Sequence, residues 1–388
     1  MKTFKKPALE IAEIISKHSN ELSSVSTNCH RVIKDIKNCR TQVLGGHTRK
    51  CSSCDFKETS YNSCRNRHCP KCQYLKKVKW VNKRVEELLP CQYFHVVFTI
   101  PANLNALILR NKRKCYDILF KASSETLKEV ASNPKNLGAS IGFVGVLHSW
   151  GQNLMDHPHI HYIVPGGGLS HDKTKWISCK ENYLLPVKIL TKVFRGKFLS
   201  MLEKSFNEGE LEFSGKLENL QDKREFKCLL VEASKKNWVV YSKEPFAGAE
   251  QVINYLGQYT HRIAISNHRL IKLENGNVHF KYRDYADGNS SKVMVLKAEE
   301  FLRRFLMHVL PKAYVRIRHF GLFSNRFKER NLELCRTFLE VKKVEVKKLE
   351  STWQKMIKTL TGVDFETCPR CKIGRIDFFP IENNINTS

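Results

Sequence analysis

Two C-x2-C pairs are the clearest chemical signal in this sequence, CSSC at 51–54 and CPKC at 69–72. Thiolates two residues apart can bind one tetrahedral ion from a single tight turn, and two such turns make a zinc site. The spacing therefore predicts one zinc ion bound by Cys51, Cys54, Cys69 and Cys72. Four more nitrogen and sulfur groups surround these pairs and would suit a second zinc site, although each could equally be a packed or surface side chain: Cys39, His47, Cys64 and His68.

A third pair, CPRC at 368–371, has no partner visible in the nearby sequence. A single knuckle supplies only two of the four ligands that a structural zinc ion requires. The sequence therefore assigns no role to Cys368 and Cys371.

Two histidines alternate with Ile160 in the segment HIHYIVP, a pattern typical of a strand. Side chains two apart on a strand share one face, so His159 and His161 should point the same way while Ile160 enters the core. Two adjacent imidazoles predict a metal site, and His148, at the end of the preceding strand, could complete it. Gln152, in the connecting loop, is the alternative third ligand. An isolated H-x-H pattern also fits ordinary core or surface histidines.

Two tyrosines, Tyr255 and Tyr259, are four residues apart in a segment with helical spacing of apolar residues. They should share one helical face. A tyrosine oxygen can attack a phosphodiester that a metal polarises, leaving a covalent phosphotyrosine, and His261 or Arg262 could offset the developing charge. The other interpretation is a pair of aromatic rings that cover a core.

The surrounding elements should hold these residues in an α+β arrangement. Segments 91–101, 142–150 and 159–168 read as strands, the last two as a hairpin with a turn at DHP. Residues 1–38, 74–90 and 102–135 read as helices, and FKCLLVEAS and NWVVYSK as strands. HRIAIS, HRLIKLENG, NVHFKYRDY and KVMVLK predict a β-meander with a hairpin turn at NGN, and LKAEEFLRRFLMHVL predicts an amphipathic helix.

The charge of the chain is strongly unbalanced. Its 388 residues contain 66 Lys and Arg against 38 Asp and Glu, a formal net charge of +28. Such a chain binds polyanions by releasing counterions, and because the excess is spread along the sequence, nucleic acid is a better partner than a membrane surface. We expect no transmembrane helix and no secretory signal, and hence a cytoplasmic protein whose 14 cysteines are thiols or metal ligands.

These motifs together resemble the HUH endonuclease superfamily, and within it the rolling-circle insertion-sequence transposases with paired tyrosines. The resemblance runs in order from residue 39 to about 330. It rests on CRTQVLGGH, SYNSCRNRHCPKCQ, FHVVFTIP, LHSWGQNLMDHPHIHYIVPGGG, YLGQYTHRIAISNHRL, FKYRDYADG and VRIRHFGLFSNR. It implies an N-terminal transposase zinc-binding domain, metal ligation by His159 and His161, and Tyr255 and Tyr259 as nucleophiles.

The resemblance further implies an enzyme that nicks and rejoins single-stranded DNA at transposon ends, with Mg²⁺ or Mn²⁺ in the catalytic site and structural Zn²⁺ in the N-terminal domain. It implies an antiparallel-sheet catalytic domain over 91–335, a helical and zinc-binding domain over 1–90, and a C-terminal helix and CxxC tail over 336–388. A non-catalytic zinc-finger DNA-binding regulator would share the basic charge and the cysteines. A metallohydrolase acting on RNA or nucleotides would share the histidines but would not need the tyrosines.

Overall fold

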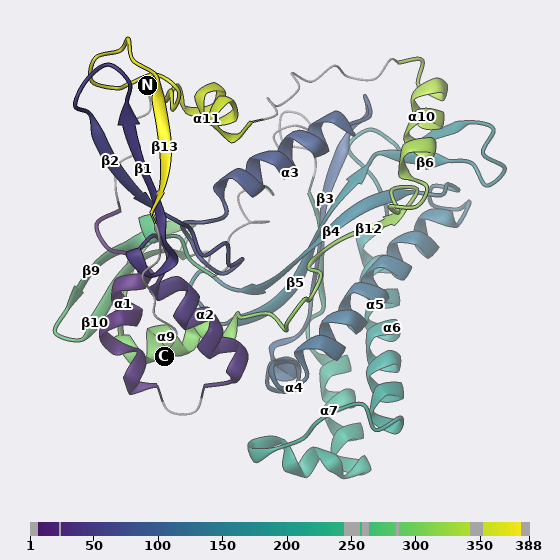
Figure 1. Cartoon of the computed structure of the whole chain (residues 1–388). Helices are drawn as coiled ribbons and strands as arrows, with labels where there is room; N and C mark the ends of the chain where they lie inside the picture. Colours follow the sequence, from purple (N-terminus) through teal and green to yellow (C-terminus); the bar gives the residue numbers. More distant parts are fainter. Residues whose placement is uncertain are drawn as a thin grey trace. The chain divides into compact units, whose positions relative to one another are not determined.

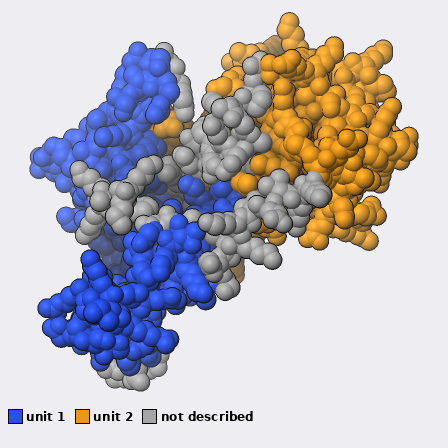
Figure 2. Space-filling view, turned by 90° about the horizontal axis from the view of Figure 1, so that it is seen from above, with its two compact units in different colours: residues 1–82, 261–309, 346–388 blue, residues 83–260, 310–345 orange. Residues whose placement is uncertain are grey.

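A computed structural model describes residues 7–22, 25–243, 257, 264–284, 287–341 and 352–381. The chain forms two compact units (Figure 2). Unit 1 comprises residues 1–82, 261–309 and 346–388, and unit 2 comprises residues 83–260 and 310–345. Both later segments of unit 1 cluster with the N-terminal part of the chain.

Unit 2 is built on a five-stranded sheet of order β12-β4-β5-β3-β8 in which every neighbouring pair is antiparallel. The strands are β3 (Tyr93–Thr99), β4 (Gly142–Trp150), β5 (Asp156–Pro165), β8 (Val239–Lys243) and β12 (Ile317–Gly321). A small sheet of β6 (Gly167–Leu169) and β7 (Trp176–Ser178) follows β5. The sequence prediction of an antiparallel α+β architecture is confirmed.

Helices cover one face of this sheet (Figure 1). The helices α4 (Asn105–Arg110), α5 (Lys112–Ser132) and α6 (Val187–Asn207) lie against it, and α7 (Lys223–Lys235) packs on α6. The interface is aromatic: Phe98 of β3 packs edge-on against Tyr162 of β5 and against Phe194 of α6. The Tyr162 hydroxyl lies 2.7 Å from the Ser123 hydroxyl of α5. Even-numbered residues of β3 and β5 therefore face the core, and the odd-numbered ones face the opposite side.

Two details of unit 2 differ from the sequence prediction. FKCLLVEAS belongs to helix α7, because Asp222 caps the helix and the buried Phe226, Leu230 and Ala233 recur at helical spacing. The DHP residues begin β5, and the turn before them is 151–155. The strands predicted at 91–101 and 142–150 are confirmed as β3 and β4, and NWVVYSK contains β8.

Unit 1 contains two antiparallel sheets, of order β13-β1-β2 and β11-β10-β9. The first is formed by β1 (Gly46–Cys51), β2 (Lys57–Tyr61) and β13 (Ile376–Ile381), and the second by β9 (Leu270–Glu274), β10 (Asn277–Asp284) and β11 (Ser290–Lys297). The second confirms the predicted meander with its turn at Asn275 and Gly276, although residues 264–266 of HRIAIS are not a strand.

The helices of unit 1 are α1 (Ile11–His18), α2 (Thr27–Lys37), α9 (Ala298–Met307) and α11 (Trp353–Thr361). Helix α1 packs against α2 and α9, and its Ile11, Ile14 and Ile15 are buried. Helix α3 (Tyr74–Glu86) runs across the boundary between the units, and α10 (Lys328–Phe338) belongs to unit 2. Within the residues that the structure describes, no helix is long and apolar enough to cross a membrane.

Candidate metal centres

Three histidines gather on the sheet face opposite α4, α5 and α6. His159 pairs with His148 across the β4–β5 ladder, and His161 pairs with Val146 in the same register. Because side chains alternate along a strand, His148, His159 and His161 all project from this one face, whereas Ile160 is fully buried on the other.

The three imidazoles are close enough to share one ion. Ring centroids are 4.3 Å apart for His148 and His161, 4.7 Å for His159 and His161, and 5.4 Å for His148 and His159. One nitrogen of each ring lies within 4.8 Å of those of the other two. The structure thus brings His148 beside the H-x-H pair, and three convergent imidazole nitrogens are a suitable donor set for a divalent metal.

Two hydrogen bonds orient the rings of the H-x-H pair. His159 Nδ1 lies 2.6 Å from the carbonyl oxygen of His157, so Nδ1 donates and Nε2 remains for a metal. His161 Nδ1 lies 2.7 Å from His95 Nε2 on the adjacent strand β3. With His161 Nδ1–H donating to His95, Nε2 of His161 is likewise left for a metal. His95 also stacks on His161, with centroids 4.9 Å apart and planes 15° from parallel.

Burial keeps these imidazoles neutral, which is the form that binds metal. It lowers the pKa of His159 to about 3 and that of His95 to about 4, with Lys243 adding to the effect on His95. Burial also holds the pKa of His148 and of His161 well below the ordinary value. The charges of His159 and Arg316 add to this shift at His148.

The sequence did not identify His95, although it identified its strand. His95 joins the cluster because Thr99 pairs with His159 and Val97 with His161, which puts the odd residues of β3 on the histidine face. Gln152, the alternative third ligand, is half-buried in the turn between β4 and β5. Tyr255, Tyr259, His261 and Arg262 lie outside the described residues.

The cysteines form two clusters, with a pairing that differs from the sequence prediction. Cys69 and Cys72 lie with Cys39 and Cys64, whereas Cys51 and Cys54 lie with Cys368 and Cys371. The prediction of one site made by Cys51, Cys54, Cys69 and Cys72 is therefore wrong. The strand β1 and the hairpin to β2 carry CSSC away from CPKC, and only tertiary pairing supplies each knuckle with its partner.

Of the four residues predicted to form a second zinc site, only the two cysteines lie in a cluster. Cys39 and Cys64 are ligand candidates of the first cluster. His68 is buried and its Nδ1 lies 2.9 Å from the side-chain oxygen of Asn66. His47 lies on β1 with its ring against Phe378 of β13, at a centroid distance of 6.2 Å. The histidines therefore belong to the packing around the cysteines, and the tail pair Cys368 and Cys371 takes part in a cluster.

Sulfur separations within both clusters fit a tetrahedral zinc ion. Zinc–sulfur bonds of 2.3 Å in a tetrahedron require sulfur atoms about 3.8 Å apart. In the first cluster Cys39 Sγ lies 3.3 Å from Cys72 and 3.6 Å from Cys69, and Cys64 lies 3.6 Å from Cys72.

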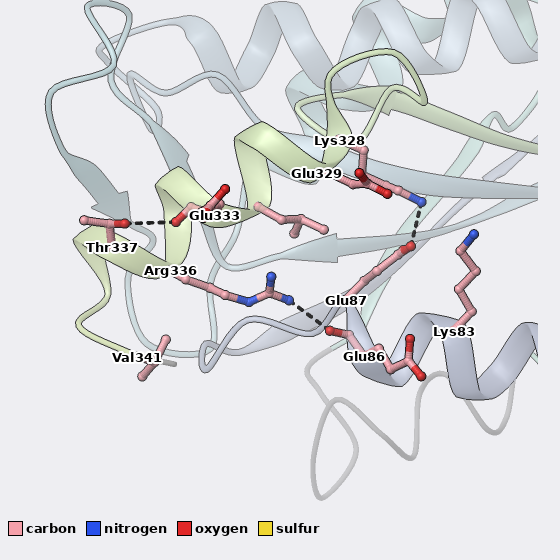
Figure 3. A pocket seen from close by; sticks show the side chains of 10 residues that line it. Lys83, Glu86, Glu87, Lys328, Glu329, Glu333, Arg336, Thr337 and Val341 are labelled. Carbon is pink, nitrogen blue, oxygen red and sulfur yellow. Dashed lines mark hydrogen bonds and ion pairs between the residues drawn. The ribbon is translucent and has the colours of Figure 1, made fainter. Parts of the chain in front are cut away.

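A pocket of about 500 Å³ in unit 2 lies between α3 and α10 (Figure 3). Its charged lining is mixed, since Lys83, Lys328 and Arg336 face Glu86, Glu87, Glu329 and Glu333. Lys328 Nζ donates to Glu87 across 2.6 Å, and Arg336 donates to the Glu86 carbonyl across 2.9 Å. Because acidic side chains would repel phosphates, this pocket does not suit a nucleic acid backbone.

Comparison with known proteins identifies two regions of the chain. A family model described as "Putative transposase" matches residues 142–331, which contain the histidine strand. A model described as "Transposase zinc-binding domain" matches residues 11–100, which contain the cluster of Cys39, Cys64, Cys69 and Cys72. No solved structure matches the chain.

Two relatives carry transposase names. "Putative transposase y4qJ" of Sinorhizobium fredii (strain NBRC 101917 / NGR234) is 45% identical over 373 residues, covering 95% of this chain and 94% of the relative. "Transposase for insertion sequence element IS801" of Pseudomonas savastanoi pv. phaseolicola is 27% identical over 304 residues, covering 74% of this chain and 68% of the relative. The two family models and the 45% identical relative together show that the chain belongs to the IS91 family of insertion-sequence transposases.

Proposed function

We propose that this transposase nicks and rejoins single-stranded DNA at transposon ends through a covalent 5′-phosphotyrosine intermediate, with unit 2 acting as an HUH endonuclease domain. Such a reaction supports transposition of the rolling-circle type. The observation that carries the proposal is the group of three neutral imidazoles on one face of an antiparallel sheet, His148, His159 and His161. Gln152 remains the alternative to His148 as third ligand.

The histidines of this face divide into metal ligands and groups that orient them. His148, His159 and His161 present nitrogens to a divalent ion, and His95 and the His157 carbonyl keep two of the rings oriented. When bound, Mg²⁺ or Mn²⁺ supplies polarisation of the scissile phosphate.

The basic groups near the histidines suit a DNA backbone. Lys243 helps to lower the pKa of His95 and Arg316 helps to lower that of His148, so both cations lie near the histidine group. Fixed positive charge at that position favours the charge that develops during attack. The overall charge of +28 supplies further backbone attraction, and we expect the protein to act on DNA in the cytoplasm, at the nucleoid.

The covalent step exchanges one phosphate ester for another. The phenolic oxygen of Tyr255 or Tyr259 attacks the phosphorus, the bond from phosphorus to the 3′ oxygen breaks, and the phenolic proton leaves as the 3′ hydroxyl gains one. The phosphotyrosine ester conserves the energy of the broken bond, so rejoining needs no ATP. Two tyrosines allow one to retain the first DNA end while the other makes a second cut.

Covalent capture of a labelled single-stranded oligonucleotide carrying a transposon end tests the proposal. We expect a labelled adduct that survives denaturing electrophoresis, requires Mg²⁺ or Mn²⁺, and maps by mass spectrometry to the peptide that contains Tyr255 and Tyr259. The double variant Tyr255→Phe, Tyr259→Phe should lose the adduct, because phenylalanine keeps the ring and removes only the oxygen. Tyr183→Phe is the matched control, since Tyr183 is exposed elsewhere on unit 2.

The metal site has a separate test. His161→Ala should abolish the adduct and leave binding of single-stranded DNA within about threefold, whereas His171→Ala, at an exposed loop position, should alter neither. Equal loss of binding and capture in His161→Ala would make the histidines structural. Full capture by the double tyrosine variant would place the nucleophile elsewhere, and binding without capture under all metal conditions would favour a non-catalytic DNA-binding regulator.

A further inference from the structure

Two distant parts of the chain meet in the three-stranded sheet of unit 1. Strand β13 pairs with β1 along its full length, from Gly46 opposite Ile381 to Cys51 opposite Ile376. Figure 1 shows β13, from the C-terminal end of the chain, beside β1 and β2. Each segment carries a C-x2-C pair next to this ladder, CSSC at the end of β1 and CPRC before β13.

The two cysteine pairs have the geometry of one metal site. Cys51 Sγ lies 3.6 Å from Cys371 Sγ, and Cys54 Sγ lies 3.7 Å from Cys368 Sγ. All four sulfurs lie within 4.8 Å of one another. These separations are close to the value of about 3.8 Å that tetrahedral zinc–thiolate bonds require and are much longer than a disulfide of about 2.05 Å.

The backbone around the sulfurs is shaped to match. The backbone N–H of Ser53 donates to Cys51 Sγ and that of Gly374 to Cys371 Sγ, both across 3.3 Å. Such bonds support thiolates in knuckle turns. A side chain at Gly374 would put its Cβ 2.3 Å from Cys51 Sγ, so the C-terminal turn can approach the N-terminal cysteine only with glycine there.

Further contacts connect the same two turns. Ser52 N–H donates to the Arg375 carbonyl across 2.9 Å, and Arg375 N–H donates to the Ser52 hydroxyl across 3.0 Å. Arg370 forms an ion pair with Asp55. The Arg49 guanidinium also lies over the ring of Phe365, 4.9 Å from its centroid. These contacts hold the two turns together, so that the four cysteine sulfurs converge.

We propose that Cys51, Cys54, Cys368 and Cys371 bind a second structural zinc ion, which ties the C-terminal tail of the chain to the N-terminal zinc-binding domain. Cys368 and Cys371 lie outside the stretch 11–100 matched by the zinc-binding family model, so that domain is completed by residues from the far end of the chain. The ion would join residues more than 300 positions apart in the sequence. All residues of unit 2 lie between them along the chain. Bound zinc would add to the β1–β13 ladder in keeping the tail docked.

Zinc stoichiometry provides the first measurement. The purified full-length protein should contain two zinc ions per chain, and the variant Cys368→Ser, Cys371→Ser should contain one. Cys69→Ser, Cys72→Ser should also retain one, because it removes only the other cluster. Cys228→Ser is the matched control and should retain two, since Cys228 is exposed on α7 and belongs to neither cluster.

Cysteine alkylation read by mass spectrometry provides the second measurement, and it tests the pairing directly. Zinc-bound thiolates resist alkylation, so Cys368 and Cys371 should be protected in the native protein. They should become reactive in Cys51→Ser, Cys54→Ser, with Cys39, Cys64, Cys69 and Cys72 still protected. The continued protection of the first cluster also shows that the variant is folded.

Two results would overturn the proposal. One is a native protein in which Cys368 and Cys371 react as fast as exposed Cys228. The other is loss of protection at Cys51 and Cys54 in Cys69→Ser, Cys72→Ser while Cys368→Ser, Cys371→Ser leaves them protected, which would restore the contiguous ligand set. Neither result depends on DNA nicking, so the zinc proposal and the catalytic proposal fail separately.

Discussion

The hydrogen bond from His161 to His95 allows a sharp test of how the histidine site is oriented. His95 is 7% exposed and accepts across 2.7 Å from the ring nitrogen of His161 that faces away from the metal side. It also stacks on the same ring. The substitutions His95→Phe and His95→Gln separate these two contacts, because phenylalanine keeps a stacking ring whereas glutamine keeps a hydrogen-bond acceptor.

The expected magnitude follows from the loss of that acceptor. Removing the partner of a metal-ligating histidine typically weakens metal binding by about 10- to 100-fold, or about 1.4–2.7 kcal/mol. A buried N–H left without an acceptor costs a comparable amount, about 1–3 kcal/mol. We therefore expect His95→Phe to raise the dissociation constant for Mn²⁺ by 10- to 100-fold and His95→Gln to raise it by about threefold at most.

Calorimetric titration of Mn²⁺ into protein that retains its structural zinc measures this effect. Covalent capture of single-stranded DNA over a Mn²⁺ series measures its consequence. Capture by His95→Phe should recover at saturating Mn²⁺, since His95 positions a ligand without being one. The matched control is His171→Ala, whose exposed ring is hydrogen-bonded only to the Ser132 carbonyl among the contacts that the structure describes.

Two outcomes would refute this reasoning. If His95→Phe bound Mn²⁺ like the unmodified protein, the hydrogen bond would have no part in metal binding. If its capture stayed absent at saturating Mn²⁺ while the sheet remained folded by circular dichroism, His95 would act on the reaction directly rather than through His161.

Three other expectations concern stability and binding. With structural zinc in place and no metal at the histidines, stability to urea should fall as the pH drops from about 6.5 to about 4, by about 1.4 kcal/mol per pH unit for His95. Only the unfolded chain takes up that proton in this range. A His95→Gln variant with the same pH slope would contradict this expectation. Tyr162→Phe should cost about 1 kcal/mol in urea unfolding by removing the bond to Ser123, whose hydroxyl keeps the Leu119 carbonyl as a partner; no change in the midpoint would show the bond to be unimportant. The affinity for single-stranded DNA should fall steeply with salt, with a log–log slope of about −0.7 for each phosphate contacted, and a slope near zero would rule out backbone attraction.

The sequence alone predicted those features that depend on short spacings. Alternation along HIHYIVP placed His159 and His161 on one face, because neighbouring strand residues project to opposite sides of any sheet. The β-branched and aromatic run of FHVVFTIP identified β3, and the turn at Asn275 and Gly276 identified the meander. The strand prediction failed for FKCLLVEAS, where the Asp222 cap and a buried helical face make the segment a helix.

The tertiary structure decided which distant residues meet. Cys51 and Cys54 are closer in sequence to Cys69 than to Cys368, yet the pairing of β13 with β1 brings the tail knuckle to them. Cys39 and Cys64 likewise reach Cys69 and Cys72 through folding of the intervening hairpin, and the β3–β5 register brings His95 to His161. A C-x2-C pair or a strand histidine supplies one part of a metal site. The residues that complete the site are brought to it by strand pairing, and the number of residues between two segments does not predict how close they lie in the fold.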